Sequence, residues 1–320
     1  MAVEPQSVDE DAAYYRRLDD LNVAAYWKLD LAAQAAAPVP YVWHWDELYP
    51  ALADSVELVE LQRGGAERRV LTVANPGRRP GTGATHTLQA SLQMIMPGEV
   101  APAHRHSFGA FRFIITGAGA YTVVDGEKCA MEAGDLILTP NWAWHDNGNE
   151  GAKPMVWLDG LDVPLVGALR AMFYEDYPGR VAQPVEKEEP SPAKMFKWRE
   201  AYEAAKAQPV SATEGRIHEY HDAEGKHVMP TLACYLQVLD AGTRTARRRR
   251  TASAVHFVVR GSGKSIVGDQ ELTWGQNDIV AVPNWQWCEH TAGDEEVVLF
   301  TFSDQPVLES LGLYREQQPD

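Results

Sequence analysis

The amino-acid sequence predicts an all-β dominated protein in which one β-unit occurs twice. Two observations carry this prediction, namely strand-like runs broken by turn residues and an internal repeat about 144 residues long. Between Leu88 and Leu161, short runs of Val, Ile, Leu and Phe alternate with Gly, Pro and Asp-Gly, which is typical of antiparallel strands. The pair Asp125-Gly126 predicts a hairpin turn between two of them.

The internal repeat becomes visible when Gly98 is placed on Gly242. With one deleted residue between them, the matching pairs of segments are Phe113–Gly119 with Phe257–Gly263, and Gly134–His145 with Asn277–Cys288. This period is too long for a solenoid repeat or a propeller blade, so it indicates two duplicated all-β domains.

The rest of the chain is interpreted around these two units. We expect a helical and extended N-terminal region at 1–75, a first barrel at 76–165, a helical connector at 166–215 and a second barrel at 216–320. Apolar residues spaced three or four apart predict an amphipathic helix from Glu10 to about Ala37. Within the connector, Leu169–Tyr174 and Ala193–Ala207 are predicted to be helical.

The composition excludes several classes of partner. Forty-five acidic residues against 29 basic ones give a net charge of −16, which repels nucleic acids and anionic membranes. The basic run Arg244–Arg250 lies in a strand-rich region, where it is expected to be buried rather than to bind nucleic acid. No secretory signal, membrane span or paired-cysteine pattern is recognised, so a cytoplasmic location is expected.

Three histidines are candidate metal ligands. Residues two apart on a strand share a face, so His104 and His106 are expected to point to the same side. His145 follows Pro140-Asn-Trp-Ala-Trp at the start of another strand, from which it can reach the same interior. Three imidazoles converging in a barrel form a facial site with open positions that suits iron, zinc, copper or nickel.

These histidines lie in two motifs that resemble the signatures of the cupin superfamily. The motifs are Gly98-x5-His104-x-His106 and Gly134-x5-Pro140-x4-His145. Most cupins add a glutamate ligand where this chain has Ala110. A ligand set of three histidines without a carboxylate resembles instead the gentisate 1,2-dioxygenases and their salicylate- and hydroxynaphthoate-cleaving relatives. Further similar strings are Ala66–Leu71, Ala103–His106, Arg112–Ile115, Trp157–Asp162 and Phe302–Glu309.

The resemblance implies a bicupin fold of two jelly-roll β-barrels, one iron(II) ion per chain and assembly into a tetramer. It also implies that O₂ is inserted between the carboxyl-bearing and hydroxyl-bearing carbons of a salicylate-type aromatic acid. Three neutral histidines leave the ion with its full double positive charge, which favours a substrate that chelates through a carboxylate and an ionised hydroxyl.

Several other residues are assigned to the site by this resemblance. Arg112 shares the inward face of the ligands and is expected to bind the substrate carboxylate, although it could instead pair with a structural acid. Gln93, Arg68 and Asp159 match pocket positions of the family. Asp159 could equally be a turn residue, and Arg68 an ordinary surface charge.

In the second copy, the three histidines become Arg248, Arg250 and Cys288, so only one metal site per chain is expected. A relocated site built from His256, His290 and Glu289 is the alternative. Gln237 is a candidate for closing the substrate pocket, or else a core-facing polar residue.

Departures from the gentisate pattern bear on the substrate. Asn147 replaces a histidine of the family, and asparagine cannot act as a base near neutral pH. Gln89 and Ser91 stand where an aromatic and a small apolar residue are common, and His44 adds a polar group. The hypothesis is therefore 5-nitrosalicylate, ahead of gentisate, halogenated salicylates and 1-hydroxy-2-naphthoate. A non-enzymatic ligand-binding cupin is the alternative from another class, and a metal-dependent isomerase or decarboxylase would require the missing carboxylate.

Overall fold

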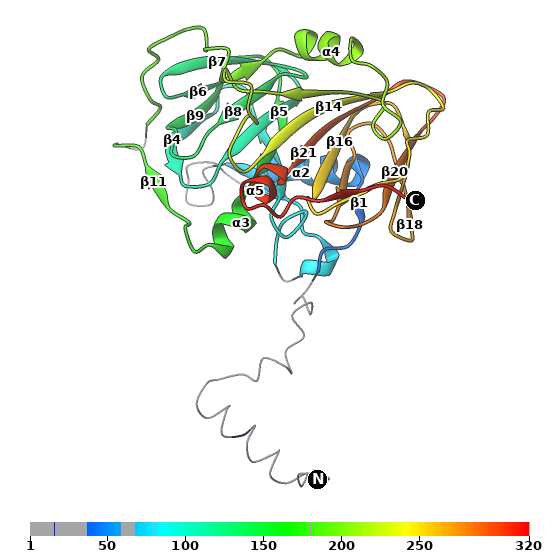
Figure 1. Ribbon diagram of the computed structural model, residues 1–320. Coiled ribbons are helices and arrows are strands. Elements are labelled where there is room, and N and C mark those ends of the chain that lie inside the picture. Colours follow the sequence, from blue (N-terminus) through cyan, green and yellow to red (C-terminus); the bar gives the residue numbers. More distant parts are fainter. Residues whose placement is uncertain (1–15, 17–36, 59–67, 80, 180, 320) are drawn as a thin grey trace. The chain divides into compact units, whose positions relative to one another are not determined.

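The computed structural model describes residue 16 and residues 37–58, 68–79, 81–179 and 181–319. These residues form mainly antiparallel strands arranged as two barrels (Figure 1), which confirms the all-β prediction. Of the helix predicted from Glu10 to Ala37, all but Arg16 and Ala37 lies outside the described residues.

The first barrel is made of two sheets. One has the strand order β12 (Met195–Phe196), β8 (Leu136–Thr139), β5 (Ala110–Thr116), β10 (Met155–Leu161), β3 (Gln89–Ile95) and β2 (Arg69–Thr72). The other has the order β11 (Tyr174–Asp176), β4 (Val100–His106), β9 (His145–Asn149), β6 (Ala118–Val124) and β7 (Glu127–Glu132). Strands β11 and β12 come from the segment between the barrels.

The second barrel repeats this plan. Its larger sheet has the order β1 (Tyr41–Trp43), β19 (Ile279–Val282), β16 (Ala254–Arg260), β21 (Val297–Ser303), β14 (Ala233–Leu239) and β13 (Arg216–Tyr220). The smaller sheets are β18 (Gln270–Trp274), β17 (Gly263–Val267) and β20 (Cys288–Ala292), and β15 (Arg249–Arg250) with β22 (Glu316–Gln317). Strand β1 thus joins the second barrel from the N-terminal side.

The described helices of more than one residue are α2 (Trp45–Leu58), the short η2 (Pro76–Arg78), α3 (Val163–Ala168), α4 (Trp198–Lys206) and α5 (Gln305–Ser310). Of the described helices, none is long and apolar enough to cross a membrane. The helix predicted at 169–174 is wrong, because α3 ends before it, Arg170 has a positive φ of 56°, and Tyr174 begins β11. The predicted helix at 193–207 begins later, because Met195 and Phe196 pair with β8.

The two barrels share their tight turns, as the repeat predicts. Gly98 and Gly242 adopt positive φ angles of 79° and 67°, and so do Trp142 and Trp285, at 64° and 57°. The predicted Asp125-Gly126 hairpin joins β6 to β7 with φ angles of 45° and 77°, which suits a turn with both central residues in the left-handed region.

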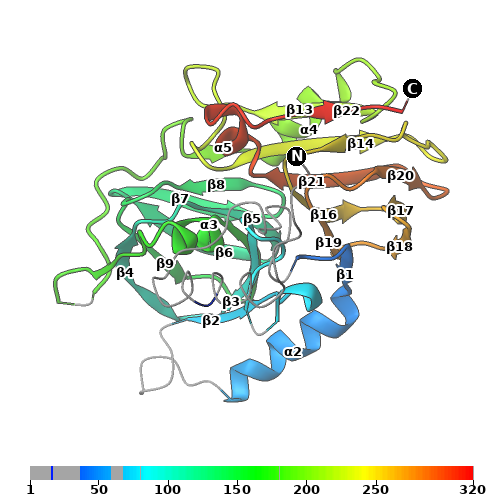
Figure 2. The same cartoon turned by 60° about the horizontal axis from the view of Figure 1, so that its bottom comes forward.

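The barrels pack through the outer faces of their larger sheets (Figure 2). Phe113 of β5 stacks on Phe300 of β21 with ring centroids 4.2 Å apart, and Phe111 meets Phe302 edge-on at 5.1 Å. All four rings are fully buried, and burying a phenylalanine contributes roughly 1.5–3 kcal/mol. Aromatic packing therefore holds the two barrels in one unit.

A reciprocal pair of hydrogen bonds to two buried carboxylates joins the barrels as well. Thr231 of the second half donates to Asp162 at the end of β10, and Thr87 of the first half donates to Asp304 at the end of β21. The threonines are 144 residues apart, like the halves of the repeat. Burial raises the pKa of Asp304 to about 6, although its hydrogen bonds from Thr87 and Ser253 oppose this shift.

Replacing Thr231 with valine is expected to lower the free energy of unfolding by about 1–3 kcal/mol, because the buried Asp162 carboxylate then loses a donor. Denaturant titration measures this effect. Thr273→Val is the control, since Thr273 is exposed on β18 and its replacement should change the value by less than about 0.5 kcal/mol. Equal effects of the two substitutions would contradict the role given to Thr231.

Candidate active site

The three predicted ligands meet inside the first barrel. His104 and His106 lie two residues apart on β4, so their side chains point to the same face of the sheet. His145, the first residue of β9, lies directly across from His104. The ring centroid of His104 is 4.2 Å from that of His145 and 5.3 Å from that of His106. One ligand atom from each side chain lies within 4.8 Å of the others, and all three side chains are buried.

The loop before β9 brings His145 to this position. Trp142 takes a left-handed conformation, and its backbone N–H donates to the carbonyl of His106 at 2.7 Å. The loop is thereby tied to the strand that carries the other two ligands. The cupin motif around Pro140 thus places the third histidine through a backbone constraint.

Two of the histidines are held in one tautomer. Nδ1 of His106 lies 2.7 Å from the carbonyl of Phe108, and Nδ1 of His145 lies 3.0 Å from that of Ala143. A carbonyl only accepts, so each Nδ1 carries the proton and each Nε2 keeps its lone pair. Burial lowers the pKa of His106 to about 4 and that of His145 well below its usual value. Both rings are therefore neutral near pH 7.

His104 has a different partner. Its Nδ1 lies 2.6 Å from Nη2 of Arg68, which also donates to the carbonyl of Pro102 at 2.6 Å. Burial, followed by the charge of Arg68, lowers the pKa of His104 to about 2. Because a guanidinium only donates, binding a metal through Nε2 requires Arg68 to release this nitrogen. Arg68 is thus placed at the site and contacts a ligand directly.

A row of polar residues crosses the opposite sheet. Ser91 of β3, Asp159 of β10 and Arg112 of β5 lie in register across neighbouring strands. Arg112 donates to Thr139 at 2.6 Å, and its Nε lies 3.7 Å from the Asp159 carboxylate. Burial raises the pKa of Asp159 to about 6, although the charge of Arg112 opposes this shift. The alternative that Arg112 pairs with an acid is therefore observed, but the pairing is loose.

Two buried polar side chains, Arg112 and Asn147, have atoms without a hydrogen-bond partner among the described residues. Within the described part of the chain, Nε of Arg112 and both amide atoms of Asn147 are buried without a hydrogen-bond partner. Asn147 lies two residues after His145 on β9, so both side chains face the same side. Buried polar groups normally have partners, and exceptions often indicate a site that binds something.

The remaining predicted residues divide into two groups. Gln93 is buried on β3 opposite Trp157, and Gln89 donates to Ser91 at 3.2 Å, while Ser91 lies 3.0 Å from Thr72. His44 and Gln237 are not brought to this site. His44 lies 2.9 Å from Asp278 beside the second barrel. Gln237 donates to the carbonyl of Glu214 in that barrel.

The described residues of the second barrel do not bring together a comparable set of metal ligands. Among the residues that the structure describes, His104, His106 and His145 are the one group of three or more suitable side chains that could hold a metal ion. The relocated site is wrong because Glu289 pairs with Arg244 at 2.6 Å, whereas the neighbouring Cys288 and His290 face into the barrel. The structure thus places the three predicted ligands together in the first barrel, and one metal ion per chain stays a prediction.

Comparisons with known proteins agree with this geometry. A cupin domain model matches residues 91–162. The chain is 34% identical to a 5-aminosalicylate 1,2-dioxygenase from Comamonas sp., covering 98% of this chain and 92% of the relative. It is 37% identical to a gentisate 1,2-dioxygenase from Streptomyces sp., covering 94% and 93%. This chain belongs to the bicupin gentisate 1,2-dioxygenase family.

The solved structures of this family support the assignment. A salicylate 1,2-dioxygenase from Pseudoaminobacter salicylatoxidans, in a crystal structure of adducts with gentisate, matches with a TM-score of 0.88 and 32% identity. The match covers 99% of this chain and 96% of that one. The bicupin dioxygenase described here is accordingly a ring-cleaving oxidoreductase, and not a binding protein without activity.

Sequence reasoning missed two residues of the bicupin site. Thr139 accepts the hydrogen bond from Arg112, and Tyr174 stacks on His104 with ring centroids 5.0 Å apart. Thr139 could have been found, because it directly precedes the Pro140 motif at the end of an apolar strand. Tyr174 could not, since its position depends on the pairing of β11 with β4.

The geometry predicts that His145→Ala abolishes metal binding, because two imidazoles do not complete a facial site. Metal content per chain, measured by elemental analysis after reconstitution, should fall from about one to near zero. His221→Ala is the matched control, since His221 lies on the surface near Glu219, and it should retain the metal. An unchanged metal content in His145→Ala would show that the ligand set is wrong.

Proposed function

We propose that this bicupin dioxygenase uses one iron(II) ion, held by His104, His106 and His145, to cleave a salicylate-type acid with O₂. The observation that carries the proposal is a set of three buried, neutral imidazoles facing a buried guanidinium. The neutral ligands fit a divalent ion and leave its charge available for an anionic chelator. When bound, the iron supplies the redox chemistry between O₂ and the ring.

The roles of the protein residues follow from their surroundings. Arg112 binds the substrate carboxylate, because its buried Nε has no hydrogen-bond partner among the described residues and its planar fork suits a carboxylate. Asp159 positions Arg112, since its carboxylate and the Thr139 hydroxyl contact the guanidinium from two directions. Arg68 adds positive charge beside His104, whose Nδ1 it releases when the metal binds through Nε2.

The preference for the ring substituent is set by four polar residues, namely Asn147, Ser91, Gln89 and Gln93. Asn147 offers a buried donor and acceptor without described partners, and Gln89, Ser91 and Thr72 form a hydrogen-bonded polar array. Asparagine cannot take up a proton near neutral pH, so the pocket recognises a substituent through hydrogen bonds and not through proton exchange. A nitro group accepts such bonds, which favours 5-nitrosalicylate as the substrate.

Gentisate is the second candidate. Relatives that align over more than 90% of this chain are named gentisate 1,2-dioxygenases, and the amide of Asn147 can both donate to and accept from a 5-hydroxyl group. The preference between these two substrates therefore depends on the residues around the metal site.

Steady-state kinetics on a substrate panel test this function. The panel contains 5-nitrosalicylate, gentisate, 5-aminosalicylate, 5-chlorosalicylate, salicylate and 1-hydroxy-2-naphthoate, assayed with iron-reconstituted protein and with O₂ uptake recorded. We expect one O₂ per ring cleaved and the highest kcat/KM for 5-nitrosalicylate. A higher kcat/KM for gentisate would contradict the proposed substrate. The absence of O₂ uptake with all six acids would contradict the proposed reaction.

Arg112→Met is expected to lower kcat/KM by about 100-fold or more, because losing one partner of a buried charged pair costs about 3 kcal/mol or more. Arg112→Lys should restore only part of the activity, since lysine cannot form two parallel bonds to a carboxylate. Both variants should retain the metal, because Arg112 is not a ligand. An unchanged KM for the acid would exclude Arg112 from substrate binding.

A further inference from the structure

The second barrel encloses a cavity at the place that corresponds to the metal site of the first. Its volume is about 60 Å³, room for a few water molecules. Arg248, Arg250 and Cys288, which replace the three histidines in the repeat, all line it. The duplicated barrel has therefore kept an interior site and changed its chemistry from neutral imidazoles to guanidinium groups.

Two other polar residues of this cavity also correspond to residues assigned to the active site. Shifted by 144 residues, Gln93 becomes Gln237 and Arg112 becomes His256, and both replacements line the cavity. His256 is buried and lies 2.7 Å from the Thr301 hydroxyl through Nδ1. Gln237 donates to the Glu214 carbonyl at 2.8 Å. The cavity thus keeps polar groups on the same faces that serve the substrate pocket in the first barrel.

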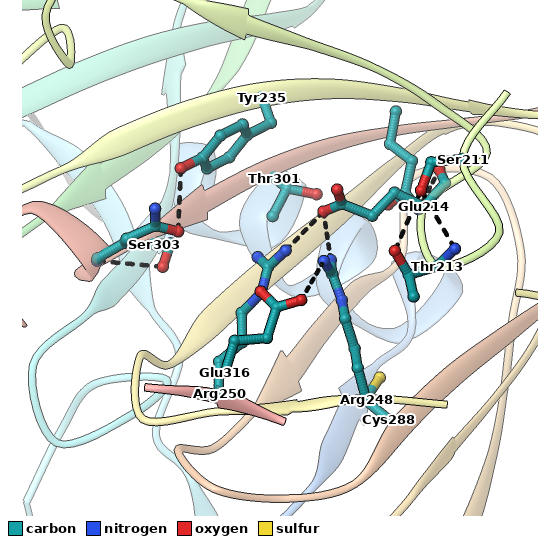
Figure 3. A network of polar contacts seen from close by, with 12 residues as sticks. Ser211, Thr213, Glu214, Tyr235, Arg248, Arg250, Cys288, Thr301, Ser303 and Glu316 are labelled. Atoms are coloured by element: carbon teal, nitrogen blue, oxygen red, sulfur yellow. Dashed lines mark hydrogen bonds and ion pairs between the residues drawn. The ribbon is translucent and has the colours of Figure 1, made fainter. Parts of the chain in front are cut away.

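A carboxylate of the protein itself occupies the cationic end of this cavity. Oε1 of Glu214 accepts hydrogen bonds from Arg248 and, at 2.7 Å, from Arg250, as Figure 3 shows. Burial raises the pKa of Glu214, but the charges of Arg248 and Arg250 more than offset this, and the pKa lies below its usual value. Glu214 is therefore ionised near pH 7.

Glu214 reaches the cavity from a short turn and not from a barrel strand. Ser211 and Gly215 exchange two backbone hydrogen bonds, at 2.6 and 2.9 Å, which close the turn that carries Glu214. Both arginines bond the same oxygen of Glu214. A free carboxylate could instead present one oxygen to each guanidinium, which is the stronger arrangement.

We propose that the second barrel is a binding site for a small free carboxylate, which Arg248 and Arg250 bind and whose place Glu214 takes in this structure. The nearby Glu316, 3.0 Å from Nε of Arg250, keeps part of the arginine charge compensated when Glu214 leaves. The site is distinct from the iron site, and it makes the second barrel a candidate for sensing carboxylates.

Calorimetric titration with maleate, a four-carbon dicarboxylate, tests the proposal on the full-length protein. Glu214→Gln removes the competing charge, so it should bind maleate about tenfold more tightly than the wild type, or more. Adding Arg248→Met and Arg250→Met to that variant should abolish this binding, whereas adding Arg112→Met should leave it unchanged. The neutral diamide of maleate should not bind to any of these variants.

The controls separate binding from misfolding. Circular dichroism and the melting temperature establish that each variant folds, and Glu214→Asp, which retracts the carboxylate by one methylene group, offers a milder change with an intermediate expected affinity. Absence of maleate binding at 10 mM to a folded Glu214→Gln would overturn the proposal. Binding that survives loss of both arginines would overturn it too, and either result would leave the ion pairs with a purely structural role.

Discussion

The alternation of side chains along β5 is the constraint on which the rest of this structure depends. Phe111 and Phe113 point outwards and pack on Phe300 and Phe302 of the other barrel, while Arg112 between them points into the active site. A shift of one residue in the register of β5 would bury a charge between the barrels and place a phenylalanine beside His104, His106 and His145. The packing of the barrels and the position of Arg112 in the active site are thus specified by the same seven residues.

Burial is the second physical factor that shapes the site. It lowers the pKa values of all three histidines and raises that of Asp159. The imidazoles are thereby kept neutral and available to a metal. The Asp159 carboxylate lies 3.7 Å from Nε of Arg112, so it compensates the arginine charge only weakly. The resulting site carries positive charge without a carboxylate ligand, which is the electrostatic setting that an anionic aromatic chelator requires.

The two barrels show how one scaffold supports two kinds of interior. In the first, backbone carbonyls orient His106 and His145 towards a shared point. In the second, the corresponding positions carry arginines, and Glu214 brings a negative charge to the place where the first barrel would hold a metal. Despite this change, both halves of the repeat retain the equivalent hydrogen bonds from Thr87 and Thr231 to the other barrel.

The sequence by itself determined the all-β class, the duplication and the three histidines, because these features depend on local periodicity and on residue identity at short range. Only the tertiary structure decided that the side chains of His44 and Gln237 bond to Asp278 and Glu214, away from the three histidines, and that Tyr174 stacks on His104. It also placed residues 169–174 outside a helix and brought Glu214 to Arg248 and Arg250. These outcomes depend on pairing between distant strands, which the local pattern of one chain does not contain.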